Sequence, residues 1–225
     1  MYDINLLIIE DEPQIREIIR TYAEKENYSV YEAGTGAEAF NAFEERDYQM
    51  VLLDVMLPDT DGWTILRKFR DQSTTPVIML TARSEEDDKL FGFDLGADDY
   101  VTKPFSAKEL MARIKTVLKR NQVVTSGEVI TLGDIEMNTS FHQVSIVGKP
   151  IELTPLEYNL LAFFVDNRNL AMSRTQILDG VWGYDYFGDE RTVDTHVKRL
   201  RKKLGSAGSH VKTIRGVGYR LVVDQ

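Results

Sequence analysis

The sequence contains no cysteine and only three histidines, and both shortages limit the chemistry open to the protein. Without cysteine there can be no disulfide bond, no thiolate nucleophile and no cysteine-ligated zinc, so a structural zinc ion is not expected. The chain also has no apolar run of membrane-spanning length, and no basic segment followed by an apolar one at its start. We therefore expect a cytoplasmic protein that makes no contact with a membrane.

The charge of the chain is unevenly distributed. A length of 225 residues predicts two domains, and the formal net charge is −9. Residues 1–120 hold 24 acidic and 15 basic side chains, whereas residues 121–225 hold 12 of each. Within the second half, residues 191–220 carry nine Lys or Arg against Asp194 alone. This basic segment predicts a surface that binds a polyanion.

Five short apolar runs in the first half, INLLII, SVYEA, MVLLD, PVIML and DYVTK, alternate with segments of helical periodicity. Near-continuous apolar strands that alternate with helices are typical of a parallel sheet covered on both faces. The pattern predicts an α/β domain with a doubly wound, five-stranded parallel sheet. The polar segment NQVVTSGE ends this pattern, and the predicted boundaries are 1–121 for the domain, 122–128 for a linker and 129–225 for a second domain.

The second half begins with strand-like segments, VITLGDIEM and HQVSIVGKPIEL, and continues with helices. The first helix is predicted to start at LTPLE, where Thr154 can cap, Pro155 suits the first helical position and Glu157 completes a capping box. A second, short helix follows, and a third at residues 191–204 is stopped by Gly205. Two strands around a glycine-containing turn, KTIRGVGYRLVV, complete an α+β domain.

Acidic side chains follow two of the predicted strands in the first domain. Glu10 and Asp11 come directly after INLLII, and Asp54 ends MVLLD. In an open parallel sheet, ligands bind beyond the carboxyl ends of the strands, where the strand order reverses. Carboxylates that converge there suit Mg2+ or Mn2+, and the metal would relieve their mutual repulsion.

Two further strand ends carry groups that suit the oxygens of a phosphoryl group, Thr81 after PVIML and Lys103 after DYVT. Together with the acidic cluster they indicate phosphoryl transfer to a carboxylate, with Asp54 as the acceptor of an aspartyl phosphate. Each group alone has a more ordinary interpretation, as a solvated acidic loop, a helix cap or a surface lysine. Their joint occurrence at four strand ends favours the phosphoacceptor.

These strand-end residues resemble the receiver domain of two-component response regulators, a flavodoxin-like fold, over all five βα units. The motifs are Glu10-Asp11, Asp54 within DVMLPDTDG, Thr81-Ala82 and Lys103-Pro104-Phe105. The resemblance implies that a sensor histidine kinase supplies the phosphoryl group.

The resemblance also implies a role for each residue of the site. The metal would be held directly by Asp11, Asp54 and the backbone carbonyl of Met56, with Glu10 acting through water. Thr81 and Lys103 would bind the phosphoryl group.

A switch is implied as well. On phosphorylation the Thr81 hydroxyl would move toward the phosphate and Tyr100 would rotate inward, which would remodel the surface of the fourth helix, fifth strand and fifth helix. A half-buried strand tyrosine, however, needs no switching role.

The second half resembles the winged-helix effector domain of the OmpR/PhoB subfamily, in LTPLEYNLL, RTVDTHVKRLRKKL and TIRGVGYRL. Helix 191–204 supports this independently, because an apolar stripe is accompanied by a polar stripe formed by His196, Arg199 and Lys203. The apolar stripe would pack against the rest of the domain, and the polar stripe is predicted to enter the major groove of double-stranded DNA.

Contacts with DNA are implied by this resemblance on the helix and on the hairpin that follows it. Alternative interpretations are a solvated helix face for the charge run and a partly buried position for His196, while Arg201 suits either a phosphate contact or an internal ion pair. The implied contacts are Arg191, Thr195, His196, Lys198, Arg199 and Lys203 on the helix, and Thr213, Arg215 and Tyr219 in the hairpin. The loop 182–190, WGYDYFGDE, corresponds to a segment that contacts RNA polymerase in the family, but a packed aromatic loop explains it equally well.

A third surface is predicted on the last helix of the first domain. In the family, charged residues there pair across a two-fold receiver dimer, although a charged solvent face is the simpler interpretation. The expected pairs are Lys89 with Glu109, Asp98 with Arg120 and Asp99 with Arg113.

The expected function is a transcriptional regulator that is phosphorylated by a histidine kinase, dimerises through its receiver and binds paired DNA half-sites. It is not expected to be an enzyme beyond its own Mg-dependent phosphotransfer and dephosphorylation. A phosphatase of the haloacid-dehalogenase type would need a second aspartate two residues after the first, but position 56 is methionine. A phospho-switched module that binds only proteins is the other alternative, and the basic helix and hairpin disfavour it.

Overall fold

The computed structural model describes residues 4–82, 95–120, 129–183, 186 and 189–222. The chain divides into two compact units, Met1–Lys119 and Arg120–Gln225, and each is described by itself. The linker predicted at 122–128 lies outside the described residues. No helix among the described residues is both long enough and apolar enough to span a bilayer.

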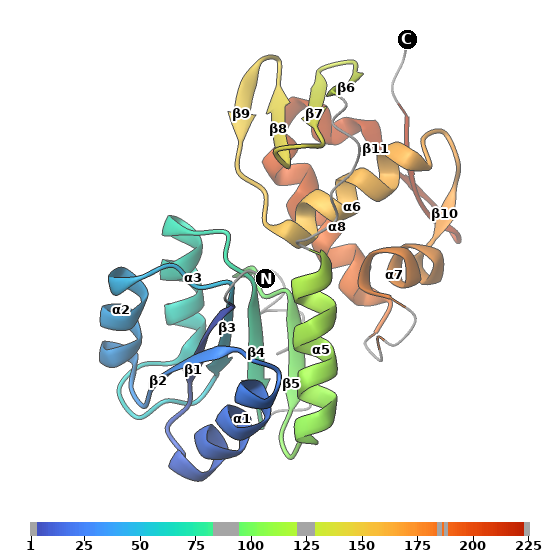
Figure 1. Ribbon diagram of the computed structural model, residues 1–225. Coiled ribbons are helices and arrows are strands. Elements are labelled where there is room, and N and C mark those ends of the chain that lie inside the picture. Colours follow the sequence, from blue (N-terminus) through green and yellow to red (C-terminus); the bar gives the residue numbers. More distant parts are fainter. Residues whose placement is uncertain (1–3, 83–94, 121–128, 184–185, 187–188, 223–225) are drawn as a thin grey trace. The chain divides into compact units, whose positions relative to one another are not determined.

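The first unit contains a five-stranded parallel sheet with strand order β2-β1-β3-β4-β5 (Figure 1). The order reverses at β1, which lies between β2 and β3, so the carboxyl ends of β1 and β3 are neighbours. This confirms the predicted flavodoxin-like receiver fold. The strands are β1 Asn5–Ile9, β2 Ser29–Ala33, β3 Met50–Asp54, β4 Val77–Thr81 and β5 Asp99–Thr102, and the helices are α1 Pro13–Lys25, α2 Gly36–Glu45, α3 Gly62–Gln72 and α5 Ala107–Arg120.

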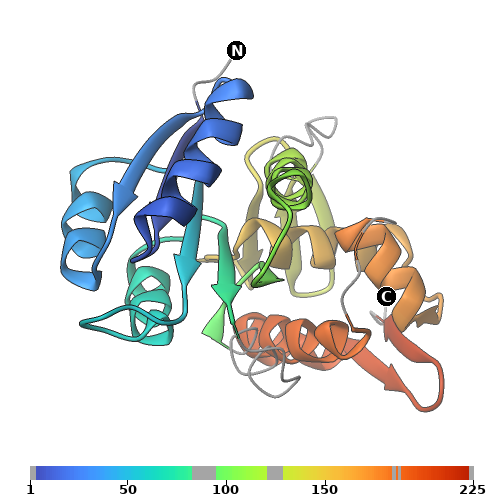
Figure 2. The ribbon, with the colours of Figure 1, turned by 90° about the horizontal axis from the view of Figure 1, so that it is seen from below.

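Among the described residues, α2 and α3 cover one face of this sheet and α1 and α5 cover the other (Figures 1 and 2). Alternate strand residues point to opposite faces, so Leu7 and Ile9 pack with α2 and α3 whereas Leu6 and Ile8 pack with α1 and α5. All four side chains are fully buried. This two-sided burial explains why the strands are continuous apolar runs rather than alternating ones.

Gly62 brings the first turn of α3 against the end of β3. A Cβ added at this position would lie 2.2 Å from the backbone oxygen of Asp54, so no larger residue fits without movement of the Asp54 backbone. The Gly62 amide donates a hydrogen bond to the carbonyl of Val55 at 2.8 Å. Asp61 caps the helix by accepting from the Thr64 amide. The sequence DVMLPDTDG therefore returns the chain tightly over the end of its own strand.

The second unit combines a four-stranded antiparallel sheet, three helices and a three-stranded sheet. Its composition confirms the predicted α+β winged-helix fold. The four-stranded sheet holds β6 Val129–Leu132, β7 Ile135–Asn138, β8 Gln143–Ile146 and β9 Lys149–Ile151; then come α6 Pro155–Asp166, β10 Met172–Ser173, α7 Arg174–Trp182, α8 Arg191–Leu204, the 3-10 turn η1 Gly205–His210, β11 Val211–Ile214 and β12 Gly218–Leu221.

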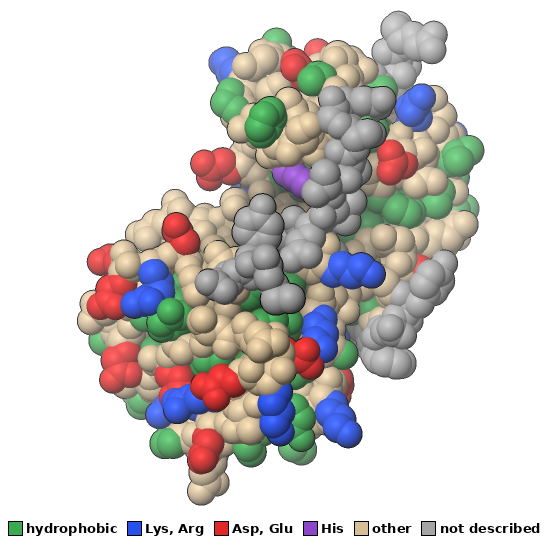
Figure 3. Space-filling model, viewed as in Figure 1, with side chains coloured by type: hydrophobic (Ala, Val, Ile, Leu, Met, Phe, Trp, Pro, Cys, Tyr) green, Lys and Arg blue, Asp and Glu red, His purple; other side chains and the backbone are tan. Residues whose placement is uncertain are grey.

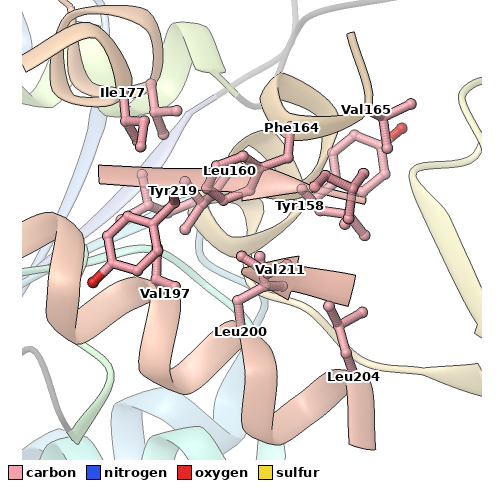
Figure 4. Packing of buried hydrophobic residues seen from close by; sticks show 14 of the residues in the cluster. Tyr158, Leu160, Phe164, Val165, Ile177, Val197, Leu200, Leu204, Val211 and Tyr219 are labelled. Atoms are coloured by element: carbon pink, nitrogen blue, oxygen red, sulfur yellow. The ribbon is translucent and has the colours of Figure 1, made fainter. Parts of the chain in front are cut away.

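The core of the second unit lies between α6, α8 and the β11–β12 hairpin. Figure 4 shows Leu160 and Phe164 of α6 opposite Val197 and Leu200 of α8, with Val211 of the hairpin between them. The predicted capping box of α6 is present, and α7 begins with a second one built from Ser173 and Gln176. Two helices thus start at defined residues, which fixes where their side chains meet α8.

Candidate functional site

The predicted acidic cluster forms at the carboxyl ends of β1 and β3. Carboxylate oxygens of Glu10, Asp11 and Asp54 lie within 4.8 Å of one another. Glu10 and Asp54 have exposed fractions of 0% and 3%, whereas Asp11 is exposed. Three converging carboxylates, of which one faces solvent, form an oxygen-rich donor set that suits a hard divalent cation reached from outside. The residues present therefore fit Mg2+ or Mn2+.

Lys103, which follows β5, bridges the two buried carboxylates. Its Nζ lies 2.6 Å from Asp54 Oδ2 and 2.8 Å from Glu10 Oε1. Burial lowers the pKa of Lys103, but the hydrogen bonds and charges of Asp54 and Glu10 outweigh burial and raise the pKa above its usual value. The ammonium is therefore a fixed positive charge at the Asp54 carboxylate.

The carboxyl group of Glu10 has a raised pKa. Burial raises its pKa to about 7, and the negative charge of Asp54 acts in the same direction, while the hydrogen bond from Lys103 opposes them. A carboxyl group that is costly to ionise when buried gains from a nearby cation. Proton uptake by Glu10 and metal binding at this cluster should therefore compete near neutral pH.

Asp54 is further oriented by the loop that follows it. The Met56 amide donates a hydrogen bond of 3.0 Å to Asp54 Oδ1, so the two carboxylate oxygens have different partners. The Met56 side chain is exposed beside the cluster.

Thr81 and Tyr100 lie on the adjacent strands β4 and β5. Both are buried, and the Tyr100 ring centroid lies 6.0 Å from that of Trp63. The tyrosine ring is thus already directed inward. The switch between these residues stays a prediction.

Arg16 is a residue of this site that sequence reasoning missed. Its guanidinium, on the first turns of α1, donates hydrogen bonds to the backbone carbonyls of Glu10 and Asp11, and its Nε lies 3.4 Å from Glu32. Arg16 therefore holds the loop that carries the acidic pair. Its position five residues after Asp11 was the only available signal.

The charged residues expected at a dimer interface are largely paired within the chain. Arg113 lies 3.1 Å from Asp99 and 3.1 Å from Glu109, and the buried Asp98 lies 2.8 Å from Arg70. The Asp98 carboxylate also accepts a hydrogen bond from the Val77 amide, and its pairing with Arg120 across a dimer stays a prediction. Lys89 and the Arg120 side chain lie outside the described residues. Figure 3 shows acidic and basic side chains interspersed on the visible face of this unit.

The basic helix α8 exposes part of the surface that is expected to contact DNA, including Arg191 and Lys198. Within the predicted stripe of His196, Arg199 and Lys203, His196 is 1% exposed with its ring 5.1 Å from that of Trp182, and its contact with DNA stays a prediction. His196 lies three residues after Val193, so helical periodicity places both on the buried side.

The exposed face of α8 is centred on Arg191, Lys198 and Lys202, with Thr195 partly exposed between them. These four positions have spacings of four, three and four residues, which define one side of a helix. Lys202 was missed, although this spacing was present in the sequence.

Glu157, at the start of α6, lies beneath the edge of α8. Its side chain is 0% exposed, and Lys203 Nζ lies 2.6 Å from Oε2 whereas Arg199 Nη2 lies 3.3 Å from Oε1. The same carboxylate accepts a 2.8 Å hydrogen bond from the Thr154 amide and so closes the capping box. Two of the predicted DNA contacts are thus ion-paired to a buried acid.

The β11–β12 hairpin is attached to α8 at two points. Arg201 Nε and Nη2 donate to the carbonyl of Val211 at 2.9 and 2.6 Å, and Nη2 also donates to Thr213 Oγ1. Of the two roles left open for Arg201, the structure shows an internal one. Asp194 accepts hydrogen bonds of 2.7 Å from both Arg174 Nε and the Tyr219 hydroxyl.

The ring of Tyr219 is buried in the core (Figure 4), and a contact of Tyr219 with DNA stays a prediction. Burial, followed by the hydrogen bond to Asp194, raises the pKa of Tyr219 to about 12. Thr213 and Arg215 are exposed, as is Lys212, and Gly216 adopts a φ of 74° at the turn. The exposed basic groups of the hairpin therefore lie around a glycine turn.

The aromatic loop after α7 is partly described. Trp182 is buried in the core, with its ring 6.1 Å from that of Tyr186. For these two residues, the structure favours packing. Residues 184–185 and 187–188 lie outside the described part of the chain.

Comparisons with known proteins agree with this geometry. A family model described as response regulator receiver domain matches residues 6–115, and one described as transcriptional regulatory protein, C terminal, matches residues 148–221. The transcriptional regulatory protein SrrA of Staphylococcus aureus is 41% identical over 229 residues, which cover 97% of this chain and 95% of that protein.

Two solved structures are similar over nearly the whole chain. The response regulator DrrB of Thermotoga maritima, described as an OmpR/PhoB homologue, is 32% identical with a TM-score of 0.54, covering 98% of this chain and 100% of that one. A mutant form of RitR is 26% identical with a TM-score of 0.77, covering 97% and 98% of the two chains.

Proposed function

The chain belongs to the OmpR/PhoB subfamily of two-component response regulators, and from this premise we propose that Asp54 accepts a phosphoryl group which controls DNA binding. The observation that carries the proposal is the bridge of Lys103 across Asp54 and Glu10, next to the exposed Asp11. Three strand ends contribute a nucleophile, a cation and metal ligands to one point. A solvated acidic loop would not bury two carboxylates around one lysine.

The proposed reaction takes the phosphoryl group from the phosphohistidine of a sensor kinase. The P–N bond breaks as a P–O bond to Asp54 forms, and the imidazole leaves with the bonding electron pair. Lys103 holds its ammonium where negative charge gathers on the phosphoryl oxygens, and the Thr81 hydroxyl lies on the adjacent strand. Mg2+ or Mn2+ held by Asp11, Asp54 and the Met56 carbonyl, with Glu10 nearby, would neutralise charge between donor and acceptor.

Phosphorylation is proposed to favour dimers of the receiver unit. Arg113 already forms ion pairs with Glu109 and Asp99 within the chain. If these residues paired instead with those of a second copy, the number of ion pairs would stay the same. Of these groups only Glu109 is well exposed, and an exposed pair selects register more than it supplies affinity. Two tethered effector units then bind paired half-sites through a raised effective concentration.

DNA is proposed to bind on the exposed face of α8 and on the hairpin. This surface contains the exposed basic side chains of the unit's most basic segment, which suits the phosphates that border a major groove. Lys203 is left out because its ammonium lies 2.6 Å from Glu157. The proposed contacts are Arg191, Thr195, Lys198, Arg199 and Lys202 on the helix, and Lys212, Thr213 and Arg215 on the hairpin. A contact of residues 182–190 with RNA polymerase stays a prediction.

Phosphorylation is tested by incubation of the full chain with acetyl phosphate and Mg2+, followed by intact mass measurement. The wild type should gain one phosphoryl group, and Asp54→Ala should gain none. Asp59→Asn is the matched control, because Asp59 is an exposed acid of the same loop whose carboxylate accepts from the Gly36 and Ala37 amides. Continued modification of Asp54→Ala would reject Asp54 as the acceptor.

DNA binding is tested by selection from a random duplex pool at one fixed salt concentration, with and without beryllofluoride and Mg2+. Enrichment of two half-sites about one helical turn apart only in the activated sample would support the switch. Absence of any enriched motif in both samples would instead favour a module that binds proteins.

A further inference from the structure

The two capping boxes of the second unit differ in one respect. In α7 the third helical position is Gln176, whose neutral amide oxygen accepts from the Ser173 amide at 2.9 Å. In α6 the corresponding residue is Glu157, whose carboxylate accepts from the Thr154 amide at 2.8 Å. Either side chain can close a capping box. The negative charge of Glu157 is therefore not required for the cap.

What distinguishes Glu157 is its second set of neighbours. It is 0% exposed, and both carboxylate oxygens are paired with cations of α8, Oε2 with Lys203 and Oε1 with Arg199. Burial of an unpaired carboxylate costs free energy, so Lys203 and Arg199 compensate the negative charge of Glu157. A glutamine at this position would need no such compensation. The Arg199 side chain is only 14% exposed, and that of Lys203 is 32% exposed.

Arg199 lies at the border between the buried and the exposed faces of α8. It is one residue after the exposed Lys198 and three before the exposed Lys202. Arg reads a base edge through a planar fork, and a fork is most selective when its plane is already fixed. The carboxylate of Glu157 supplies a fixed anchor 3.3 Å from one nitrogen of that fork.

We propose that Glu157 is a positioning residue of the DNA-binding surface, whose buried carboxylate anchors Arg199 and takes Lys203 as its counter-ion. Lys203 is then not a DNA contact. This inference rests on the proposed binding of DNA by α8. The two adjacent lysines then have different roles: Lys202 faces solvent, whereas Lys203 neutralises the buried carboxylate of Glu157.

The first experiment needs no DNA. Urea unfolding of the wild type, Glu157→Gln, Lys203→Met and the double variant forms a double-mutant cycle. Each single variant leaves a buried partner less compensated, so the two effects should be non-additive by about tenfold in the unfolding equilibrium constant, with the double variant recovering stability. Additive effects would overturn the ion-paired bridge.

The second experiment measures binding of the full chain to a selected duplex and to a random-sequence duplex over a range of salt. Removal of one phosphate contact lowers the slope of log affinity against log salt by about 0.9. Lys202→Met should show this decrease on both duplexes, whereas Lys203→Met should leave the slope unchanged. A decrease for Lys203→Met equal to that of Lys202→Met would make Lys203 a phosphate contact and overturn its assignment.

The positioning role of Glu157 is tested by the ratio of the affinity for the selected duplex to the affinity for the random one. Glu157→Gln, and the double variant with restored stability, should lose about tenfold in the ratio of selected to random affinity, since Arg199 loses its anchor. A merely structural role for Glu157 would leave this ratio unchanged in the double variant, and that result would overturn the positioning role. If the wild type bound neither duplex, the proposed function would fail, and the unfolding cycle would still report separately on the bridge.

Discussion

The two units each contain a buried ionic cluster, and the clusters have opposite compositions. In the first unit, one cation, Lys103, bridges two carboxylates, Glu10 and Asp54. In the second, one carboxylate, Glu157, bridges two cations, Lys203 and Arg199. The first cluster retains excess negative charge, which a divalent cation and a phosphoryl group can use. The second belongs to a segment with excess positive charge, which suits a polyanion.

The comparison shows how similar ion-pair chemistry can serve a reaction in one unit and recognition in the other. Asp11 stands exposed beside the first cluster, so an ion can reach it from solvent. Glu157 has no exposed surface, so its carboxylate contacts groups of the protein, Arg199 and Lys203 among them, rather than solvent. The functional difference follows from solvent access as much as from charge.

The largest expected effect comes from removal of the bridging cation of the first unit. Lys103→Met should lower the rate of phosphorylation by acetyl phosphate at least about 100-fold, because a preorganised charge at the phosphoryl oxygens is lost. The same variant should bind Mg2+ more tightly, since Lys103 no longer competes for Asp54 and Glu10. Phosphorylation rates and Mg2+ calorimetry measure the two effects.

Lys115→Met is the control for this variant, because Lys115 is a half-exposed lysine of α5 that pairs with Glu26. It should behave as the wild type in both measurements. Weaker Mg2+ binding by Lys103→Met would contradict the competition between lysine and metal.

The second expected effect is a dependence of stability and of Mg2+ affinity on pH, which follows from the excess negative charge of the first cluster. The pKa of Glu10 is raised from 4.5 to about 7 in the folded chain, so its contribution to stability is fully present below 4.5 and is lost as pH rises through 7. Mg2+ affinity should change in the opposite direction and fall by up to about tenfold per pH unit below 7, since the metal competes with a proton. Calorimetry at pH 6 and 8 measures this fall.

Glu10→Gln should remove the dependence of stability on pH in this interval, as followed by urea unfolding without Mg2+. An unchanged pH profile in the variant would assign the titration to another group.

A smaller effect is expected where the hairpin is attached to α8. Tyr219→Phe removes the hydroxyl that donates to Asp194 and should reduce the free energy of unfolding by about 1.5–3 kcal/mol, a typical range for a hydrogen bond to a charged group. Phosphorylation of Asp54 should be unaffected, which tests whether the first unit is independent of the hairpin in the second. A loss of phosphorylation in this variant would break the comparison between the units.

The smallest effect is expected at the surface of α5. Glu109→Gln removes an i,i+4 ion pair with Arg113, worth about 0.3–0.5 kcal/mol of stability. If these groups exchange partners in a dimer, beryllofluoride-induced dimerisation measured by sedimentation should weaken a few-fold. Dimerisation equal to that of the wild type would remove Glu109 from the interface.

Much of the first unit could be predicted from sequence because its signals are local. Each strand is a short apolar run, and each functional residue comes directly after one, so the order of elements already predicts that the strand ends converge. Arg16 was missed because its partners are backbone carbonyls, which leave no mark in the sequence. The intrachain pairing of Asp98 with Arg70 was missed because the residues are 28 positions apart.

The second unit was harder to predict at the level of side chains. The sequence of α8 contains two polar stripes, one through His196, Arg199 and Lys203 and another through Arg191, Lys198 and Lys202. Periodicity alone does not say which stripe faces solvent, because both carry positive charge. The choice depends on what packs against the helix.

The sequence by itself determined the two folds, the capping boxes, the strand-end positions of the acidic residues and the basic segment, because each is marked by a local pattern of residues. Only the tertiary structure decided which cations remain exposed. Lys203 meets Glu157 across 46 residues and Lys103 meets Glu10 across 93. Burial makes such charges seek partners at any sequence separation, and the packing of helices and strands determines which partners are within reach.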